Sequence, residues 1–317
     1  DLARYSIEKG FDVIYCLNSP RPLSIENPNF PLQIEKLHKL LNELEKIGLN
    51  KLRVASPKLM SYIYKYFPQF EILGSTASDY KIIQEFNFLK QVHPYVKEIV
   101  PSHNVNKNFM LLKNIRKLGF ELEIMVNEGC IQGCSNRFEH ECTYTDNNIE
   151  LYTKEPLFQE FYCKWNCSRI ERQNPLLYMV KGNHIYPWEI SEYEKIGITK
   201  FKLNGRDGMT DNNNSQSDFL GMIQTYLKCV DDIKNIENLP VINFVSNSMM
   251  KDKLKNLTVK KIKKYLPNIR HFVKYGYLCS SICGYKCNYC YKISEKIQNV
   301  FYEKEQEIQI CKITKQE

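Results

Sequence analysis

Residues 51–76 read KLRVASPKLMSYIYKYFPQFEILGST and hold one complete strand–helix–strand unit. The β-branched and apolar run Lys51–Ala55 predicts a strand, Pro57–Tyr66 repeats its apolar residues at helical spacing, and Glu71–Leu73 predicts the next strand. Ser56 stands directly before the helix, where an N-cap is expected. Two strands joined by one helix in this order lie parallel, with a right-handed crossover.

The same alternation continues on both sides of this unit, and about five to seven such units favour a TIM-barrel-like parallel (β/α) barrel over an open sheet. The chain opens with an expected helix, Leu2–Gly10, so we expect a further barrel strand to precede it. The other expected strands are Asp12–Leu17, Glu98–Val100, Glu121–Val126, Tyr178–Val180 and Lys200–Leu203. The other expected helices are Leu32–Ile47, Tyr80–Lys90, Val105–Leu118, Pro187–Lys195 and Ser217–Lys228.

Composition excludes several classes of protein. Of the 317 residues, 43% are hydrophobic and 25% are charged, which suits a globular core and excludes a disordered tail or a collagen-like fibre. No run reaches the roughly 18 uncharged apolar residues of a membrane helix. The start lacks an apolar leader, so we expect a cytoplasmic protein without disulfides, in which clustered cysteines are metal ligands or catalytic.

The charge balance permits an anionic partner. The net charge of +8 allows an RNA or an anionic small-molecule substrate without requiring either. Seven of the lysines lie between Lys251 and Lys264, where they form either a solvated helix face or a nucleic-acid-binding patch. We expect a barrel over residues 1–235, with a cysteine-rich insertion over 128–175, and a lysine- and cysteine-rich extension over 236–317.

Polar residues follow most of the expected strands. In parallel α/β folds the ligand site forms at the carboxyl ends of the strands. Ser56, Ser75 and Ser102 are expected to be ordinary helix N-caps. Asn127 and Glu128 differ, because a cysteine cluster follows them at once.

Two CxxxC pairs lie within a 38-residue window of the expected insertion. Thiolates are soft ligands that suit zinc or an iron–sulfur cluster, and zinc sites more often use CxxC, so the spacing favours iron and sulfur. Cys142 and Cys16 are rival ligands. The two pairs are Cys130 with Cys134 and Cys163 with Cys167.

A third cluster packs four cysteines into 12 residues near the C-terminus, a strong signal for zinc or a 4Fe–4S cluster. Its last three cysteines form CxxxCxxC, the spacing of radical SAM enzymes. Only 27 residues follow it, whereas in that family most of the barrel comes after the motif, so we keep radical SAM chemistry as an alternative. The four are Cys279, Cys283, Cys287 and Cys290.

Charged residues stand near the first cluster and near a later strand end. Arg137 offers a permanent charge and a planar donor fork, or it pairs with a surface carboxylate. His140 can titrate near neutral pH or bind metal. Lys202 and Arg206 flank the end of an expected strand, where they could bind an anionic group or cap the sheet edge.

Several blocks together resemble peptidase family U32, the collagenase-like peptidases. Residues 127–140, NEGCIQGCSNRFEH, resemble the family's Asn-x-Gly-Cys…Cys-Pro-x-Arg…His signature, with Ser135 where many relatives have proline. Residues 162–167, YCKWNC, resemble its second cysteine pair, and 188–206, WEISEYEKIGITKFKLNGR, its block ending in FKLxGR. The resemblance spans about residues 1–210.

This resemblance implies a barrel related to the TIM barrel with a 4Fe–4S cluster at its mouth. Several relatives look like oxygen-independent hydroxylases or RNA-modifying proteins, and some pair with a second subunit of the family. We therefore expect an iron–sulfur enzyme. The alternatives are a metal- or thiol-dependent peptidase, a radical SAM-type enzyme and a non-catalytic metal-binding module. The expected residues are Cys130, Cys134, Cys163 and Cys167 for the cluster, Glu128, Arg137 and His140 for catalysis, and Asn127, Lys202 and Arg206 for the substrate.

Overall fold

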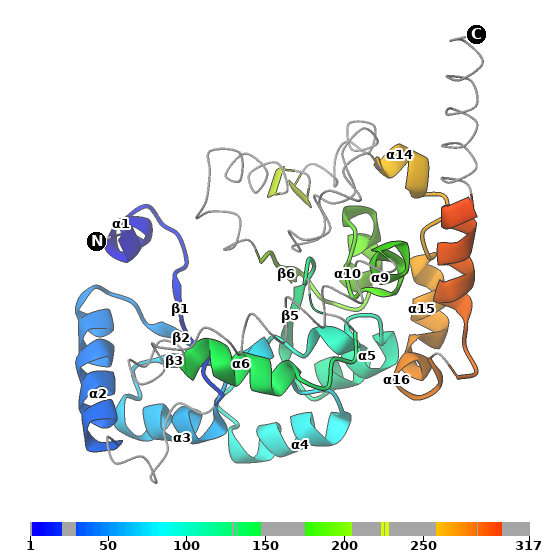
Figure 1. Ribbon diagram of the computed structural model, residues 1–317. Coiled ribbons are helices and arrows are strands. Elements are labelled where there is room, and N and C mark those ends of the chain that lie inside the picture. Colours follow the sequence, from blue (N-terminus) through cyan, green and yellow to red (C-terminus); the bar gives the residue numbers. More distant parts are fainter. Residues whose placement is uncertain are drawn as a thin grey trace, which may run out of the picture.

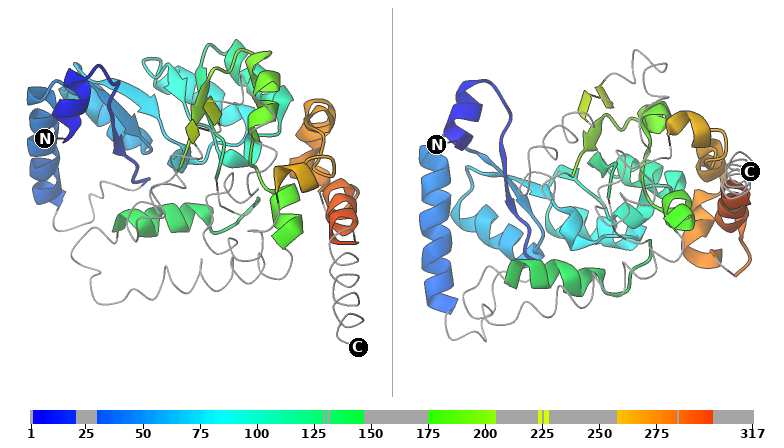
Figure 2. Two further views of the ribbon diagram at one scale, coloured as in Figure 1. Left: turned by 90° about the horizontal axis from the view of Figure 1, so that it is seen from above. Right: turned by 45° about the horizontal axis from the view of Figure 1, so that its top comes forward.

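The computed structural model describes residues 2–20, 30–128, 130, 132–146, 175–204, 223–224, 226–227, 258–283 and 285–299. Within them, six strands form one parallel sheet in the order β1-β2-β3-β4-β5-β6, so each strand pairs with the next one in the chain. The sheet curls into half of a barrel (Figures 1 and 2). The expected parallel α/β fold is confirmed, in a half-barrel form over the described residues. The strands are β1 Ile14–Leu17, β2 Lys51–Val54, β3 Glu71–Gly74, β4 Glu98–Ile99, β5 Glu121–Met125 and β6 Lys200–Lys202.

The helices of the barrel follow the strands as the alternation predicts. The longer ones present an apolar stripe to the sheet, and residues such as Ile63, Phe86 and Ile115 are fully buried against it. Each such side chain contributes about 1.5–3 kcal/mol by leaving water. The helices are α1 Leu2–Glu8, α2 Phe30–Lys46, α3 Pro57–Tyr66, α4 Ile83–Val92, α5 Phe109–Lys117, α6 Arg137–Asp146, α9 Pro175–Lys181 and α10 Ile190–Glu194.

One expected strand is wrong. Tyr178–Val180 lies inside helix α9, Pro175–Lys181. A short apolar run is equally consistent with a buried strand or a buried helix, and Pro175, at the first helical position, is a residue that favours a helix start. The expected helix Ser217–Lys228 lies mostly outside the described residues, although 223–224 and 226–227 are helical.

The expected capping serines are confirmed. The side chain of Ser56 accepts a hydrogen bond from the N–H of Leu59 at 3.4 Å, and that of Ser75 accepts one from Ala77 at 3.2 Å. Ser102 accepts from Asn104 at 3.3 Å. These serines therefore serve the three turns that leave β2, β3 and β4.

Ion pairs between four of the strands occupy the amino-terminal side of the sheet. Arg53, on β2, reaches Glu98 at 2.8 Å and Glu123 at 2.5 Å. Lys200, at the start of β6, contacts Glu98 at 2.6 Å and Glu121 at 2.8 Å. Because these residues come from β2, β4, β5 and β6, the network ties together strands that are not all hydrogen-bonded neighbours.

The C-terminal extension docks on α5. It contains α14 Val259–Ile262, α15 Ile269–Tyr275, the 3-10 turn η9 Gly276–Leu278, α16 Cys279–Ile282 and a helix over 289–299. Both α15 and η9 contact α5. A Cβ atom on Gly276 would lie 1.8 Å from the Lys107 carbonyl oxygen, so this close approach requires glycine.

The expected insertion, the expected domain boundaries and the expected lysine patch fall on segments of which the structure describes only part. Most of the insertion expected over 128–175 lies outside the described residues, as does 228–257, so the domain boundaries stay predictions. Of the expected lysine patch, only the residues from 258 onward are described.

None of the described helices combines the length and the apolar character that crossing a membrane demands.

Candidate functional site at the barrel mouth

A buried arginine gathers three carboxylates at the carboxyl ends of the strands. Arg137 begins helix α6, which lies beside the 3-10 turn η1, Thr76–Ser78, after β3. Only 2% of its side chain is exposed. Its guanidinium lies 3.5 Å from Glu128, 3.2 Å from Glu141 and 3.7 Å from Asp79. The predicted residues Glu128 and Arg137 therefore meet at the predicted end of the barrel, joined by Asp79, which the sequence did not single out.

Asp79 is held in an uncommon conformation. Its φ is +54°, the left-handed region that non-glycine residues other than Asn and Asp rarely adopt. The Ser102 hydroxyl donates a 2.5 Å hydrogen bond to its carboxylate, and Lys81 contacts it at 2.5 Å. These contacts hold the carboxylate at the mouth, facing the guanidinium of Arg137.

His103 is completely buried between these charges. Neither of its ring nitrogens has a hydrogen-bond partner within the part of the chain that the structure describes. Burial, reinforced by the positive charge of Arg137, lowers the pKa of His103 to about 4. The imidazole is therefore neutral at physiological pH.

A second buried histidine lies close by. His184, on the segment after α9, is 1% exposed, and burial together with Lys107 lowers its pKa to about 3. The sequence analysis proposed neither histidine as a site residue. The signal that could have found His103 is its place directly after Ser102, at the end of β4.

The loop with the first cysteine pair is anchored at the mouth. The Cys130 N–H donates to the Glu128 carboxylate at 3.2 Å, and the Gly133 N–H donates to the Asn104 side chain at 2.8 Å. Burial, reinforced by the Glu128 charge, raises the pKa of the Cys130 thiol. A nucleophilic cysteine needs a lowered pKa, whereas a metal displaces the thiol proton. The environment of Cys130 is thus poor for a nucleophile.

The donor chemistry of this loop fits an iron–sulfur cluster in part. Cys130 and Cys134 are soft donors at the mouth, while Cys163 and Cys167 lie outside the described residues. Across the described ranges, no three His, Cys, Asp or Glu side chains form a group that could hold a single metal ion. The rival Cys142 is fully buried in α6, and Cys16 is exposed on β1.

The expected substrate-binding residues have different surroundings. The Asn127 side chain donates to the Asn204 carbonyl at 2.6 Å and accepts from the Asn204 N–H at 2.7 Å, so it joins the ends of β5 and β6. Lys202 is half-buried at the end of β6. Arg206 and the side chain of His140 lie outside the described residues. Their roles stay predictions.

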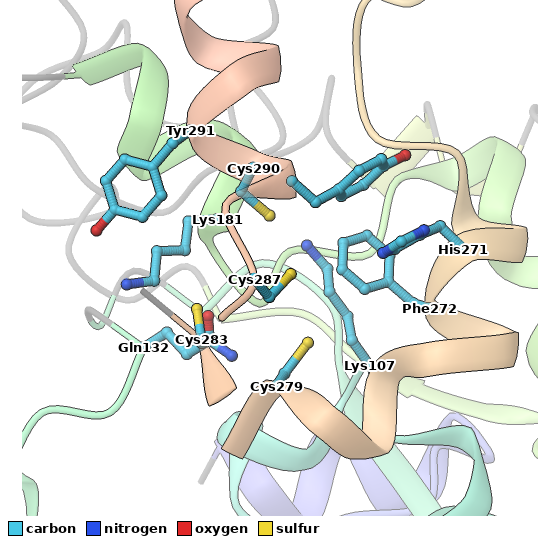
Figure 3. Close-up of a pocket in the computed structure, with 11 residues that line it drawn as sticks. Lys107, Gln132, Lys181, His271, Phe272, Cys279, Cys283, Cys287, Cys290 and Tyr291 are labelled. Atoms are coloured by element: carbon cyan, nitrogen blue, oxygen red, sulfur yellow. The ribbon is translucent and has the colours of Figure 1, made fainter. Parts of the chain in front are cut away.

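The C-terminal cysteines share a cavity of their own. Cys279, Cys283, Cys287 and Cys290 all line it, and their sulfur atoms face its interior (Figure 3). Lys107 also lines it, which the sequence did not suggest, because Lys107 lies far away in the chain. This grouping agrees with the short spacing of the four cysteines in the sequence.

Comparison with known proteins shows which family this sequence resembles. The model of peptidase family U32 matches residues 24–268. The "Uncharacterized protease MJ1657" of Methanocaldococcus jannaschii is 22% identical over 279 residues, which are 86% of this chain and 73% of that protein. The solved structure "The Structure of the U32 Peptidase Mk0906" aligns with 49% of this chain and 64% of that chain, at 16% identity and a TM-score of 0.40. Because the family model covers more than half of its length, the chain belongs to peptidase family U32.

Proposed function

We propose that this protein is an iron–sulfur enzyme that modifies a substrate at the barrel mouth, by a reaction such as oxygen-independent hydroxylation of RNA or of an anionic small molecule. The observation that carries the proposal is the buried His103, neutral and without a described partner, beside Arg137 and the loop of Cys130. Buried titratable groups with shifted pKa values gather at catalytic sites, where the protein tunes them for proton transfer.

His103 would handle the proton of the reaction. A neutral imidazole carries a proton on one ring nitrogen and accepts one on the other, so it can donate to or accept from a bound substrate hydroxyl. Arg137 would hold Glu128 and Asp79 in place around it, at the distances of 3.5 and 3.7 Å. Lys202 and Arg206 would meet an anionic group of the substrate, as the sequence suggests.

Cys130, Cys134, Cys163 and Cys167 would hold the 4Fe–4S cluster beside these groups. When bound, the cluster supplies one-electron transfer. Cluster binding would remove the thiol proton that burial otherwise keeps on Cys130. Two of these four residues lie on the loop that Glu128 and Asn104 anchor, which supports a cluster at the mouth.

The alternative is a peptidase that acts on peptides. The word "protease" in the name of the archaeal relative favours it. Two features of the mouth speak against a thiol or serine peptidase. The pKa of Cys130 is raised, and no hydroxyl or thiol is hydrogen-bonded to His103 among the described residues.

The first test is the metal content of protein purified without oxygen. We expect iron and acid-labile sulfide in equal amounts and an absorption that bleaches with dithionite. The double variant Cys130→Ser, Cys134→Ser should lose about four irons. The control Cys311→Ser, which removes a cysteine that belongs to none of the three clusters, should lose none. Zinc without iron, or peptide cleavage that survives complete removal of iron, would overturn the proposal.

The second test concerns His103. Total RNA is incubated without oxygen with the oxidised holoenzyme and an added chemical electron acceptor. A substrate C–H group and water would then give the hydroxyl product and two protons, and the two electrons would pass one at a time to the acceptor. The RNA is digested and searched by mass spectrometry for nucleosides that gain one oxygen atom. His103→Gln should keep the iron and lose about 10²–10⁴-fold in product formation. His93→Gln is the matched control, because His93 is also buried but its ring is hydrogen-bonded to the Tyr95 hydroxyl at 2.7 Å, away from the mouth. Equal losses in both variants would remove His103 from catalysis.

A further inference from the structure

The four C-terminal thiols surround one cavity because the chain between them turns tightly. Cys279 begins α16, Cys283 and Cys287 form an isolated parallel β-bridge, and Cys290 lies in the helix over 289–299. The carbonyl of Ile282 accepts hydrogen bonds from the N–H groups of 285, 286 and 287 and closes the turn. All four cysteines are free thiols, and Figure 3 shows their sulfur atoms directed into the same space.

A buried lysine enters this cavity from the barrel. Lys107 lies between η2, His103–Val105, and α5, and only 6% of it is exposed. Its ammonium donates to the carbonyl of Gly182 and lies 4.7 Å from the centre of the Phe272 ring. A buried charge is costly unless a group of opposite sign compensates it. The Glu189 carboxylate is the strongest such influence on Lys107, followed by the thiols of Cys290 and Cys279.

The arrangement of the thiols distinguishes between two kinds of metal centre. A single zinc ion draws four sulfurs to about 2.3 Å from one point. No three Cys, His, Asp or Glu side chains in the described ranges are grouped in that manner. In a 4Fe–4S cluster each thiolate binds a different iron, so the four sulfurs surround the centre at wider spacing. Four thiols that line one cavity without such a grouping are compatible with the second geometry.

We propose that Cys279, Cys283, Cys287 and Cys290 bind a 4Fe–4S cluster, and that Lys107 compensates its negative charge. Four thiolates give such a cluster a net negative charge, which a buried ammonium stabilises. The site uses none of the residues assigned to the mouth, so it stands whether or not the proposed reaction is right.

The cluster would stabilise the contact between the C-terminal extension and the barrel. Segments far apart in the chain line the cavity: Lys107 after η2, Gln132 from the loop between the first two cysteines, Lys181 at the end of α9, and the C-terminal thiols. Gly276 makes its close contact with the Lys107 backbone at the same junction. Because metal binding couples to folding, occupancy of this site should order the extension against α5.

Iron analysis of matched variants tests the site. In protein purified and reconstituted without oxygen, Cys283→Ser with Cys287→Ser should lose about four irons and four sulfides relative to wild type and to Cys311→Ser. The complementary variant Cys130→Ser with Cys134→Ser should keep about four, even if the mouth carries no cluster at all. An unchanged iron content in the C-terminal variant would overturn the proposal. So would one zinc per chain that is present in wild type and lost from that variant.

Lys107 has a separate readout. In the Cys130→Ser, Cys134→Ser background, Lys107→Met should shift the reduction potential of the remaining cluster to more negative values, because reduction adds negative charge that the ammonium no longer offsets. Lys107→Arg should restore the potential, and Lys286→Met, which removes an exposed lysine of the same turn, should leave it unchanged. A potential that does not respond to Lys107→Met would limit Lys107 to a packing role.

Discussion

The two ends of the half-barrel each bury an arginine among carboxylates, but the two arginines are paired very differently. On the amino-terminal side, Arg53 contacts Glu98 and Glu123 at 2.8 and 2.5 Å. At the mouth, the carboxylates nearest to Arg137 lie at 3.2–3.7 Å. Both side chains are almost fully buried, at 3% and 2% exposure, so burial alone does not separate them.

The difference separates a structural network from a binding site. Native proteins pair nearly all of their buried polar groups, and groups left under-satisfied call for a functional explanation. The amino-terminal network leaves its arginine closely paired. The mouth keeps an imidazole without a described partner and an aspartate at φ +54°. These features are typical of a ligand-binding site.

Replacing each arginine tests this contrast most strongly. Arg53→Met would leave Glu123 without its cation and Glu98 with Lys200 alone, and we expect it to lower the free energy of unfolding by about 3–5 kcal/mol. Arg137→Met should cost less, because its contacts are longer and Glu141 is 27% exposed. Urea denaturation of both variants measures the difference. Equal losses would show that the two arginines are equally structural.

The two ends of the half-barrel should lose stability in different pH ranges as the protein is acidified. Below pH 6.5 the unfolded chain protonates its histidines, while folded His103 stays neutral down to about pH 4, so stability falls across that window. A shift of this size is worth about 3 kcal/mol. The pKa of Glu98 is also lowered on folding: although burial raises it, Lys200 and Arg53 bring it below 4.5, so its contribution to stability is complete above pH 4.5 and is lost as the pH falls below that value.

The variant His103→Gln isolates the first window. We expect its stability to fall less than that of wild type between pH 6.5 and 4, and to show the same loss below pH 4.5. Urea denaturation at several pH values measures both. Parallel curves for variant and wild type over the whole range would contradict the pKa lowering at His103.

The sequence predicted the local parts of this molecule and missed the long-range ones. The strands and capping serines follow from short patterns, and the C-terminal cysteines are close in sequence. Tyr178–Val180 was misassigned because a three-residue apolar run carries no period. The sequence did not predict Asp79 or Lys107 as site residues. Asp79 contacts Arg137, and Lys107 contacts Gly182, and both contacts join segments that only the curled sheet brings together. Neither residue has a local pattern that sets it apart from an ordinary surface charge.

The smallest effect is expected at the rim of the amino-terminal network. Lys200 touches Glu98 at 2.6 Å and Glu121 at 2.8 Å, yet 49% of its side chain is exposed. Exposed ion pairs contribute little, because water screens them, so Lys200→Met should cost at most about 1 kcal/mol, and less at high salt. Lys195→Met, which breaks an exposed pair with Glu192 of similar length, is the matched control. Lys200→Met and Arg53→Met could instead lower the free energy of unfolding by equal amounts. The network would then act as one unit, and the short contacts of Arg53 would not explain its contribution to the stability of the protein.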